Sequence, residues 1–385
     1  MAVLTEAGTL ALHPAVCCVE KEYQIIFLCR KQALASVTVA GVTYTDSRNG
    51  VMRTDTLVHK IRVPAAALDA AKHYDVNIAP LADHCNYYPK PEPTEVYGYD
   101  FVPVPSDPDT PVRMYVLADT HGYVDAPVKA ALASGHIDAL ILDGDIGDSA
   151  DTVDMITTMH RLASAITEGR IPVIYARGNH DTRGHNAEHL ADYTPTRKGA
   201  ENGTTSFSFR LGPVWGLVLD AGEDKPDGCV EYGCVEYGGV CDFPVFRRAQ
   251  TDYFKSLIAD RKNEYEAEGV RYRVAVCHMP FHYSRHGFAN TTPDIYAEWV
   301  HLLNEMGIQV LLCGHMHHMD ELDGSIFAGD EKPAFPTLLC AAMDGEPKRQ
   351  AERWIPGTYT GTAVTCRDGE VLHEFTNHEG KEVTL

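Results

Sequence analysis

Val112-Arg-Met-Tyr-Val-Leu-Ala118 is an apolar run followed at once by Asp119-Thr-His121-Gly122, and this stretch decides the fold. A short continuous apolar run of this kind predicts a buried strand. Further apolar runs follow it along the chain, at 139–142, 171–176, 215–219, 273–277 and 310–313. Between them lie segments with helical spacing, at 125–134, 151–168, 247–268 and 293–306. Strands that alternate with helices predict a layered α/β domain.

Polar motifs follow these strands directly. They are Asp119-Thr-His121, Gly144-Asp145, Gly178-Asn179-His180, His278 and Gly314-His315-Met-His317. Each motif alone is commonly a turn, a helix cap or a structural histidine. In open α/β sheets, however, ligands bind beyond the carboxyl ends of the strands. All five motifs in order at strand ends therefore predict one shared site.

The residue types in these motifs indicate a metal site. Imidazole, carboxylate and amide oxygen suit Zn, Fe or Mn better than Ca. We expect two divalent or trivalent transition-metal ions, with Asp145 as the carboxylate that bridges them. Two closely spaced ions can polarise a phosphoryl oxygen and turn water into hydroxide near neutral pH. The predicted reaction is hydrolysis of a phosphoric ester by a hydroxide activated at a dinuclear centre.

The set of five motifs closely resembles the calcineurin-like metallophosphoesterases, over roughly residue 112 to the C-terminus. The resemblance implies a four-layer α/β/β/α fold. It implies a first metal on Asp119, His121, Asp145 and His317. It implies a second metal on Asp145, Asn179, His278 and His315. His180 would be the outer-sphere acid that protonates the leaving oxygen.

Asp148 is a departure from one branch of this family. Purple acid phosphatases carry a tyrosine three residues after the bridging aspartate, whereas this chain carries Asp148. An aspartate there is similar to the protein phosphatase branch, where it holds the catalytic histidine. We therefore expect Asp148 to pair with His180. That branch continues with an arginine, replaced here by Ser149; either Arg177 or Arg183 could substitute, or both could be surface charge.

The first hundred residues have a different pattern. Segments rich in β-branched and aromatic residues, at 22–28, 35–45, 73–78 and 95–102, predict strands. They indicate a small β-sandwich of the immunoglobulin or fibronectin III type, an arrangement similar to that of purple acid phosphatases. Prolines between 103 and 111 mark a boundary. The expected domains are residues 1–106, the sandwich, and residues 107–385, the phosphoesterase.

The formal net charge of −21 bears on partners and location. Proteins that bind extended nucleic acid usually present a basic face, so such a partner is disfavoured. Small phosphorylated substrates remain compatible, because bound cations reverse the local field. We recognise no signal peptide and no apolar run long enough for a membrane span, which predicts a cytoplasmic protein. Sequence leaves open the natural substrate, monoester or diester preference, and the oligomeric state.

Two alternative interpretations remain open. The chain could be a non-catalytic binding module, with structural metals and a sandwich that docks a partner. Gly228-Cys-Val-Glu-Tyr232 is repeated as Gly233-Cys-Val-Glu-Tyr237. The cysteines Cys229, Cys234 and Cys241 could form a third metal or redox site, although a duplicated loop fits their spacing better.

Four further polar residues lie close to the motifs. His282 and His286 follow His278 and could line a substrate pocket or be structural. His318 follows the last motif directly, but adjacent side chains diverge, so we do not expect a ligand there. Asp143 is expected at the sheet edge or behind the ligands.

Overall fold

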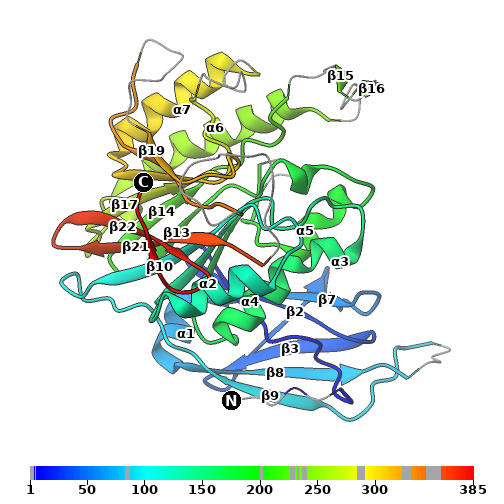
Figure 1. Ribbon diagram of the computed structural model, residues 1–385. Coiled ribbons are helices and arrows are strands. Elements are labelled where there is room, and N and C mark those ends of the chain that lie inside the picture. Colours follow the sequence, from blue (N-terminus) through cyan, green and yellow to red (C-terminus); the bar gives the residue numbers. More distant parts are fainter. Residues whose placement is uncertain are drawn as a thin grey trace.

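A computed structural model describes residue 4 and residues 6–82, 87–199, 203–225, 230–231, 234–235, 241–283, 291–322, 331–343 and 357–385. A nine-stranded sheet lies at its centre (Figure 1). Its order is β23 (Glu382–Val383), β22 (Glu370–Asn377), β21 (Thr360–Arg367), β10 (Val112–Leu117), β11 (Ala139–Asp143), β12 (Val173–Ala176), β1 (Ala15–Val19), β2 (Glu22–Leu28) and β7 (Val58–Pro64). Strands β10, β11 and β12 are parallel, as the alternating pattern predicts.

A six-stranded sheet faces the first. Its order is β13 (Phe207–Leu211), β14 (Val214–Val218), β17 (Tyr272–Val276), β18 (Val310–Cys313), β20 (Thr337–Leu339) and β19 (Asp320–Leu322). Side chains from both inner faces share one buried core, in which Met114 and Val116 of β10 lie with Val274 of β17 and Leu312 of β18. This apolar core holds the two sheets together.

Helices cover the outer face of each sheet. Helices α2 (Asp125–Ala133) and α4 (Thr158–Thr167) pack on the nine-stranded sheet, where Leu162 is fully buried. Helices α6 (Phe243–Ala259) and α7 (Pro293–Met306) pack on the six-stranded sheet (Figure 1), and Phe254 and Trp299 are buried there. Each such burial contributes roughly 2–3 kcal/mol. The fold is the four-layer α/β/β/α arrangement that the family resemblance implies.

The predicted helix at 151–168 is two helices, α3 (Val153–Ile156) and α4. Thr152 caps α3 by accepting a hydrogen bond from the Met155 amide, and Thr157 separates the two helices. The predicted helix at 247–268 instead occupies 243–259, because Asp242 caps it and a proline follows in its first turn. It is followed by the 3₁₀ turn η3 (Arg261–Asn263). In the described part of the chain, no helix is long and apolar enough to cross a bilayer.

The N-terminal segment forms a sandwich that shares a layer with the large sheet. One layer is a four-stranded sheet of order β4 (Val42–Thr45), β3 (Ala33–Val39), β8 (His73–Pro80) and β9 (Glu95–Asp100). The other consists of β1, β2 and β7, and the two layers bury a common core that includes Val37 and Ile61. The predicted strand at 35–45 is the β3–β4 hairpin, with left-handed φ at Ala40 and Gly41.

The structure differs from a simple division into two domains in one respect. Strand β1 pairs in parallel with β12, with Cys17 opposite Val173. Backbone hydrogen bonding therefore crosses from residues 1–106 to residues 107–385, and the boundary at 106 stays a prediction. The remaining described elements are short: β5 (Ser47–Arg48), β6 (Val51–Met52), α1 (Ala65–Ala71), η1 (His180–Thr182), η2 (Ala187–His189), α5 (Leu190–Tyr193), β15 (Val230–Glu231) and β16 (Cys234–Val235).

Candidate metal centre

The predicted ligands meet where the carboxyl ends of the parallel strands in the two sheets lie close together. Donor atoms within 4.8 Å of one another form three groups there: Asp119, His121 and His317; Asp145, His278 and His315; and His121, Asp148 and His180. The first two consist of predicted ligands and are called the two donor groups below. The seventh residue, Asn179, has its Oδ1 2.9 Å from His315 Nδ1. The structure therefore brings together all seven residues singled out from the sequence.

Backbone strain is concentrated at this centre. Eleven described non-glycine residues have positive φ. Five of them are predicted ligands, namely Asp119, His121, Asp145, His315 and His317. Left-handed backbone costs a residue with a Cβ of order 1 kcal/mol, and it persists where the surrounding structure requires it. The strained backbone at these residues directs their side chains towards the common centre.

Glycines beside the ligands permit a close approach of the backbone. A Cβ at Gly178 would overlap the Asp145 carboxylate, and one at Gly144 would overlap the His278 ring. At Gly314, a Cβ would lie 2.7 Å from Asp119 Oδ2. The glycine that precedes a ligand in three of the motifs therefore has a steric reason, because the ligands pack against neighbouring backbone.

His278 is positioned to bind a cation. Its Nδ1 lies 2.6 Å from the Asp143 carbonyl oxygen and so carries the proton that it donates. Its buried Nε2 has no hydrogen-bond partner, although it lies 3.1 Å from Asp145 Oδ2 and 3.8 Å from Asp119 Oδ1. Burial opposes a charge on this ring, yet the carboxylates of Asp145 and Asp119 raise the pKa of His278 well above its usual value. A metal ion among these atoms would take the place of a proton on Nε2 and coordinate this nitrogen of the neutral ring.

Asn179 points to the same conclusion. With its amide oxygen inward, that atom meets two other acceptors, Asp145 Oδ2 at 3.2 Å and His315 Nδ1 at 2.9 Å. Turned through 180°, the amide would donate to both and accept from Arg183 at 2.9 Å. Without a cation the turned amide is favoured, whereas a cation favours the inward oxygen. The residues present therefore fit a metal, and its presence sets the amide orientation.

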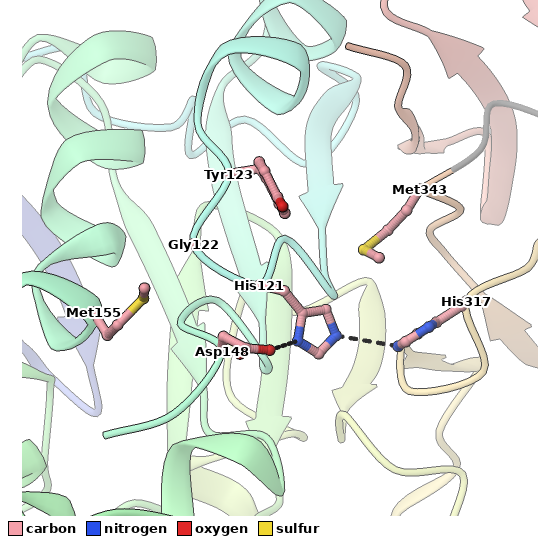
Figure 2. Close-up of a pocket in the computed structure, with 7 residues that line it drawn as sticks. All are labelled: His121, Gly122, Tyr123, Asp148, Met155, His317 and Met343. Atoms are coloured by element: carbon pink, nitrogen blue, oxygen red, sulfur yellow. Dashed lines mark hydrogen bonds and ion pairs between the residues drawn. The ribbon is translucent and has the colours of Figure 1, made fainter. Parts of the chain in front are cut away.

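Asp148 contacts His121 (Figure 2). Its Oδ1 lies 3.1 Å from His121 Nδ1, and His121 Nε2 lies 3.2 Å from His317 Nε2. If Asp148 accepts the Nδ1 proton, Nε2 of His121 is left as a donor atom for a metal. The carboxylate thus orients a predicted ligand.

The expected Asp148–His180 pair forms through a different atom. His180 Nδ1 lies 2.7 Å from the backbone carbonyl of Asp148 and 3.9 Å from its carboxylate. On the other side of the ring, Arg183 Nη1 lies 3.0 Å from His180 Nε2, an arrangement in which the arginine donates to the neutral ring. Burial, together with Arg183, lowers the pKa of His180.

Of the two candidate arginines, Arg183 lies at the centre and Arg177 does not. Arg177 forms an ion pair with buried Asp220 at 2.7 Å. Arg183 donates to Glu223 through Nε at 2.9 Å and Nη2 at 2.8 Å, and Nη2 also lies 3.1 Å from Asp224. This fork holds the guanidinium beside His180.

Glu223 and Asp224 belong to the site, yet sequence reasoning missed them. They follow β14, and Asp224 Oδ2 lies 3.6 Å from His315 Nε2. Burial, and then the hydrogen bond with Glu223, raise the pKa of Asp224 to about 7. The available signal was the position after a strand end, where polar turns gather at the ligand edge.

The other residues weighed from the sequence are not ligands, or they are not described. His282 is buried with its Nε2 3.0 Å from Thr337 Oγ1, so it does not line the pocket. His318 directs Nδ1 to the Met316 carbonyl at 2.8 Å. Asp143 lies behind His278, and burial raises its pKa to about 8. His286 and Cys229 lie outside the described residues, as does the side chain of Cys234.

A cavity of about 540 Å³ opens beside the first group of ligands. Figure 2 shows Tyr123 and Met343 on one side of His121, and Met155 beyond Asp148. The cavity is thus bounded by imidazole and carboxylate at its base and by a phenol and thioethers on its walls. Such a mixture suits a ligand with a polar head and a less polar remainder.

Comparison with solved structures supports the architecture. The chain is similar to purple acid phosphatase PPD1 from yellow lupin (Lupinus luteus) seeds, with 13% identity, a TM-score of 0.60, and coverage of 96% of this chain and 73% of that one. It is also similar to PhoD, with 11% identity, a TM-score of 0.53, and coverage of 99% and 94%. At these identities the likeness shows the fold. No curated protein sequence matches.

The sequence of the catalytic layers also matches a family model. The model for calcineurin-like phosphoesterases aligns with residues 112–319, which are more than half of the chain. This span contains all seven residues of the candidate metal centre, from Asp119 to His317. The chain belongs to the calcineurin-like phosphoesterase family.

Proposed function

We propose that this chain hydrolyses phosphoric esters at a dinuclear metal centre. Membership of the family and the phosphatase folds that it resembles support metal-dependent phosphoester hydrolysis. The single observation that carries the dinuclear assignment is the pair of adjoining donor groups. Each holds histidine nitrogens and a carboxylate oxygen that lie within 4.8 Å of one another. One ion in each group would be coordinated by these nitrogen and oxygen atoms.

The assignment of ligands follows the two groups. Asp119, His121 and His317 would hold one ion, and Asn179, His278 and His315 would hold the other, with Asp145 between them. These oxygen and nitrogen donors, without thiolate, fit Zn, Fe or Mn. When bound, a pair of such ions supplies an acidified water and withdraws charge from phosphoryl oxygens.

The protein groups around the centre would complete the site. Arg183 is positioned to contact a phosphoryl oxygen, because Glu223 fixes its guanidinium from the opposite side. When Arg183 leaves His180 Nε2 for the substrate, that nitrogen can carry a proton towards the leaving oxygen. The Asp148 carbonyl holds His180 Nδ1 throughout. This role for His180 is the one expected from the sequence. Asp148 would orient both His121 and His180.

The cavity supports a small phosphorylated substrate and leaves room for its leaving group. A volume of about 540 Å³ suits a metabolite-sized molecule. The charge of −21 disfavours extended nucleic acid as a partner.

The alternative function is a binding module in which the metals are structural. It predicts a chain that binds Mn or Zn and turns over nothing. The contact of Arg183 with His180, 3.0 Å apart and next to the predicted ligands, favours the enzyme, because a structural centre does not need this pair.

An aryl phosphate assay distinguishes these functions. Protein supplied with Mn or Zn should release the phenol of an aryl phosphate monoester or diester, and chelator should abolish that activity reversibly. Comparing the monoester with the diester also establishes which class is preferred. Stable metal binding with no turnover of either substrate would favour the binding module.

A further inference from the structure

A second cavity, of about 380 Å³, lies between the N-terminal sheets and α5 and shares no lining residue with the cavity at the metal centre. We call it the basic pocket, and its charged lining consists of Arg48, Arg53, Lys60, Arg62, Asp46 and Asp192. Four cations thus face two carboxylates in a chain whose net charge is −21. This local excess of positive charge contrasts with the negative net charge of the whole chain and requires an explanation.

Arg53 has most of its hydrogen-bonding capacity unused. Its side chain is only 16% exposed, yet its guanidinium makes a single hydrogen bond within the described residues, to Asp46 Oδ2 at 3.5 Å. Its other carboxylate neighbour, Asp192 Oδ1, is 3.9 Å away. A guanidinium carries five N–H donors, and a largely buried one is normally satisfied.

Both carboxylates have other partners in or beside the pocket. Asp46 Oδ2 lies 3.0 Å from buried His59 Nδ1, and Asp192 Oδ1 lies 3.0 Å from Arg48 Nη2. Arg62 is paired outside this set, with Glu22. Arg48, Arg53 and Lys60 therefore share the charges of Asp46 and Asp192.

Lys60 adds a cation without an acidic partner. Its Nζ donates to the Ala191 carbonyl at 2.5 Å and to Thr196 Oγ1 at 3.3 Å. Among the described residues, no carboxylate lies within the 4.0 Å of an ion pair with it. Burial, and then the neighbouring charge of Arg62, lower the pKa of Lys60 to about 7. An anion in the pocket would stabilise its ammonium form.

We propose that the basic pocket binds a small phosphate-class dianion, either inorganic phosphate or the phosphoryl group of a phosphomonoester. Arginine forks match the oxygens of such an anion in pairs, and lysine contributes a point charge. The volume admits a phosphate with a small organic group attached. The pocket is concave and lies on an acidic protein, which favours a small anion over a polyanion.

Equilibrium dialysis of the metal-loaded full chain against radiolabelled inorganic phosphate tests this proposal. Wild type should show two classes of site, of which one depends on the metal centre. Arg53→Gln should weaken the other class about tenfold or more, since a charge-assisted hydrogen bond is lost. Turnover of an aryl phosphate should stay unchanged. Methylphosphonate, which is not hydrolysed, then shows by competition whether the pocket also accepts an ester-like anion.

Lys198→Gln is the matched control, because Lys198 is a largely exposed cation that pairs with Glu22 outside the pocket. It should leave both classes intact. If Arg53→Gln does not fold, the exposed Arg48→Gln serves as second variant with the same expected loss. Phosphate binding by either folded variant that equals wild type overturns the proposal, as does a single class of site that Asp145→Asn removes.

Discussion

Asp145→Asn should release both metals and lower the turnover of an aryl phosphate by about 1,000-fold or more, equivalent to several kcal/mol of transition-state stabilisation. Asp145 is the proposed bridge: its Oδ2 lies 3.1 Å from His278 Nε2 and 3.2 Å from the Asn179 amide. Against the effect of burial, its charge also helps to raise the pKa of His121 in the other group. An amide of the same shape keeps the Oδ1 contact with the His180 backbone but loses the bridging charge. Metal content and kcat measured on the same sample check this result.

A control separates the metal effect from loss of a buried charge. Asp220 is also buried, and its carboxylate pairs with Arg177 outside the centre. Asp220→Asn should therefore retain both metals, even if the melting temperature falls. Full activity in folded Asp145→Asn would refute the assignment of this residue as the bridge.

His180→Gln should keep both metals and reduce kcat by about 10²- to 10⁴-fold, the usual contribution of a positioned proton donor. His180 is not one of the predicted ligands, although it groups with His121 and Asp148, and its Nε2 is 4.0 Å from Asp145 Oδ2. Glutamine retains a hydrogen-bonding side chain but cannot protonate the leaving oxygen. Metal analysis and steady-state kinetics on the same preparation check both parts.

The pH profile adds a readout that a purely structural role would not change. Burial lowers the pKa of His180, so its acid form is present only below that pKa. Wild-type kcat should therefore fall as pH rises through this value, and His180→Gln should lose that dependence. His318→Gln is the control and should behave as wild type, because within the described residues the hydrogen bond of His318 goes to the Met316 carbonyl and not to a ligand. An unchanged kcat in His180→Gln would remove it from the mechanism.

The catalytic layers were predictable because their signal is local. The apolar runs of β10, β11 and β18 are short and buried, and the residues that follow each run meet because parallel strands end at one edge. The seven-residue cluster therefore follows from the order of motifs along the chain, without knowledge of any distance.

Other parts depend on packing between distant segments. Asp148 directs its carboxylate to His121 and its carbonyl to His180. This arrangement depends on the local backbone orientation, which cannot be predicted from a sequence motif. Glu223 and Asp224 enter the site from a loop whose sequence resembles an ordinary turn. The continuity of the sandwich with the large sheet arises from the β1–β12 pairing, which joins residues more than 150 positions apart.

The central claim is a centre that holds two metals and needs both. Its most direct test is a titration of chelator-treated full chain with Mn or Zn, with bound metal and aryl phosphate turnover recorded at each step. We expect two ions per chain at saturation, with full turnover reached only as the second ion binds. Saturation at one ion, or full turnover in the metal-free chain, would contradict the account.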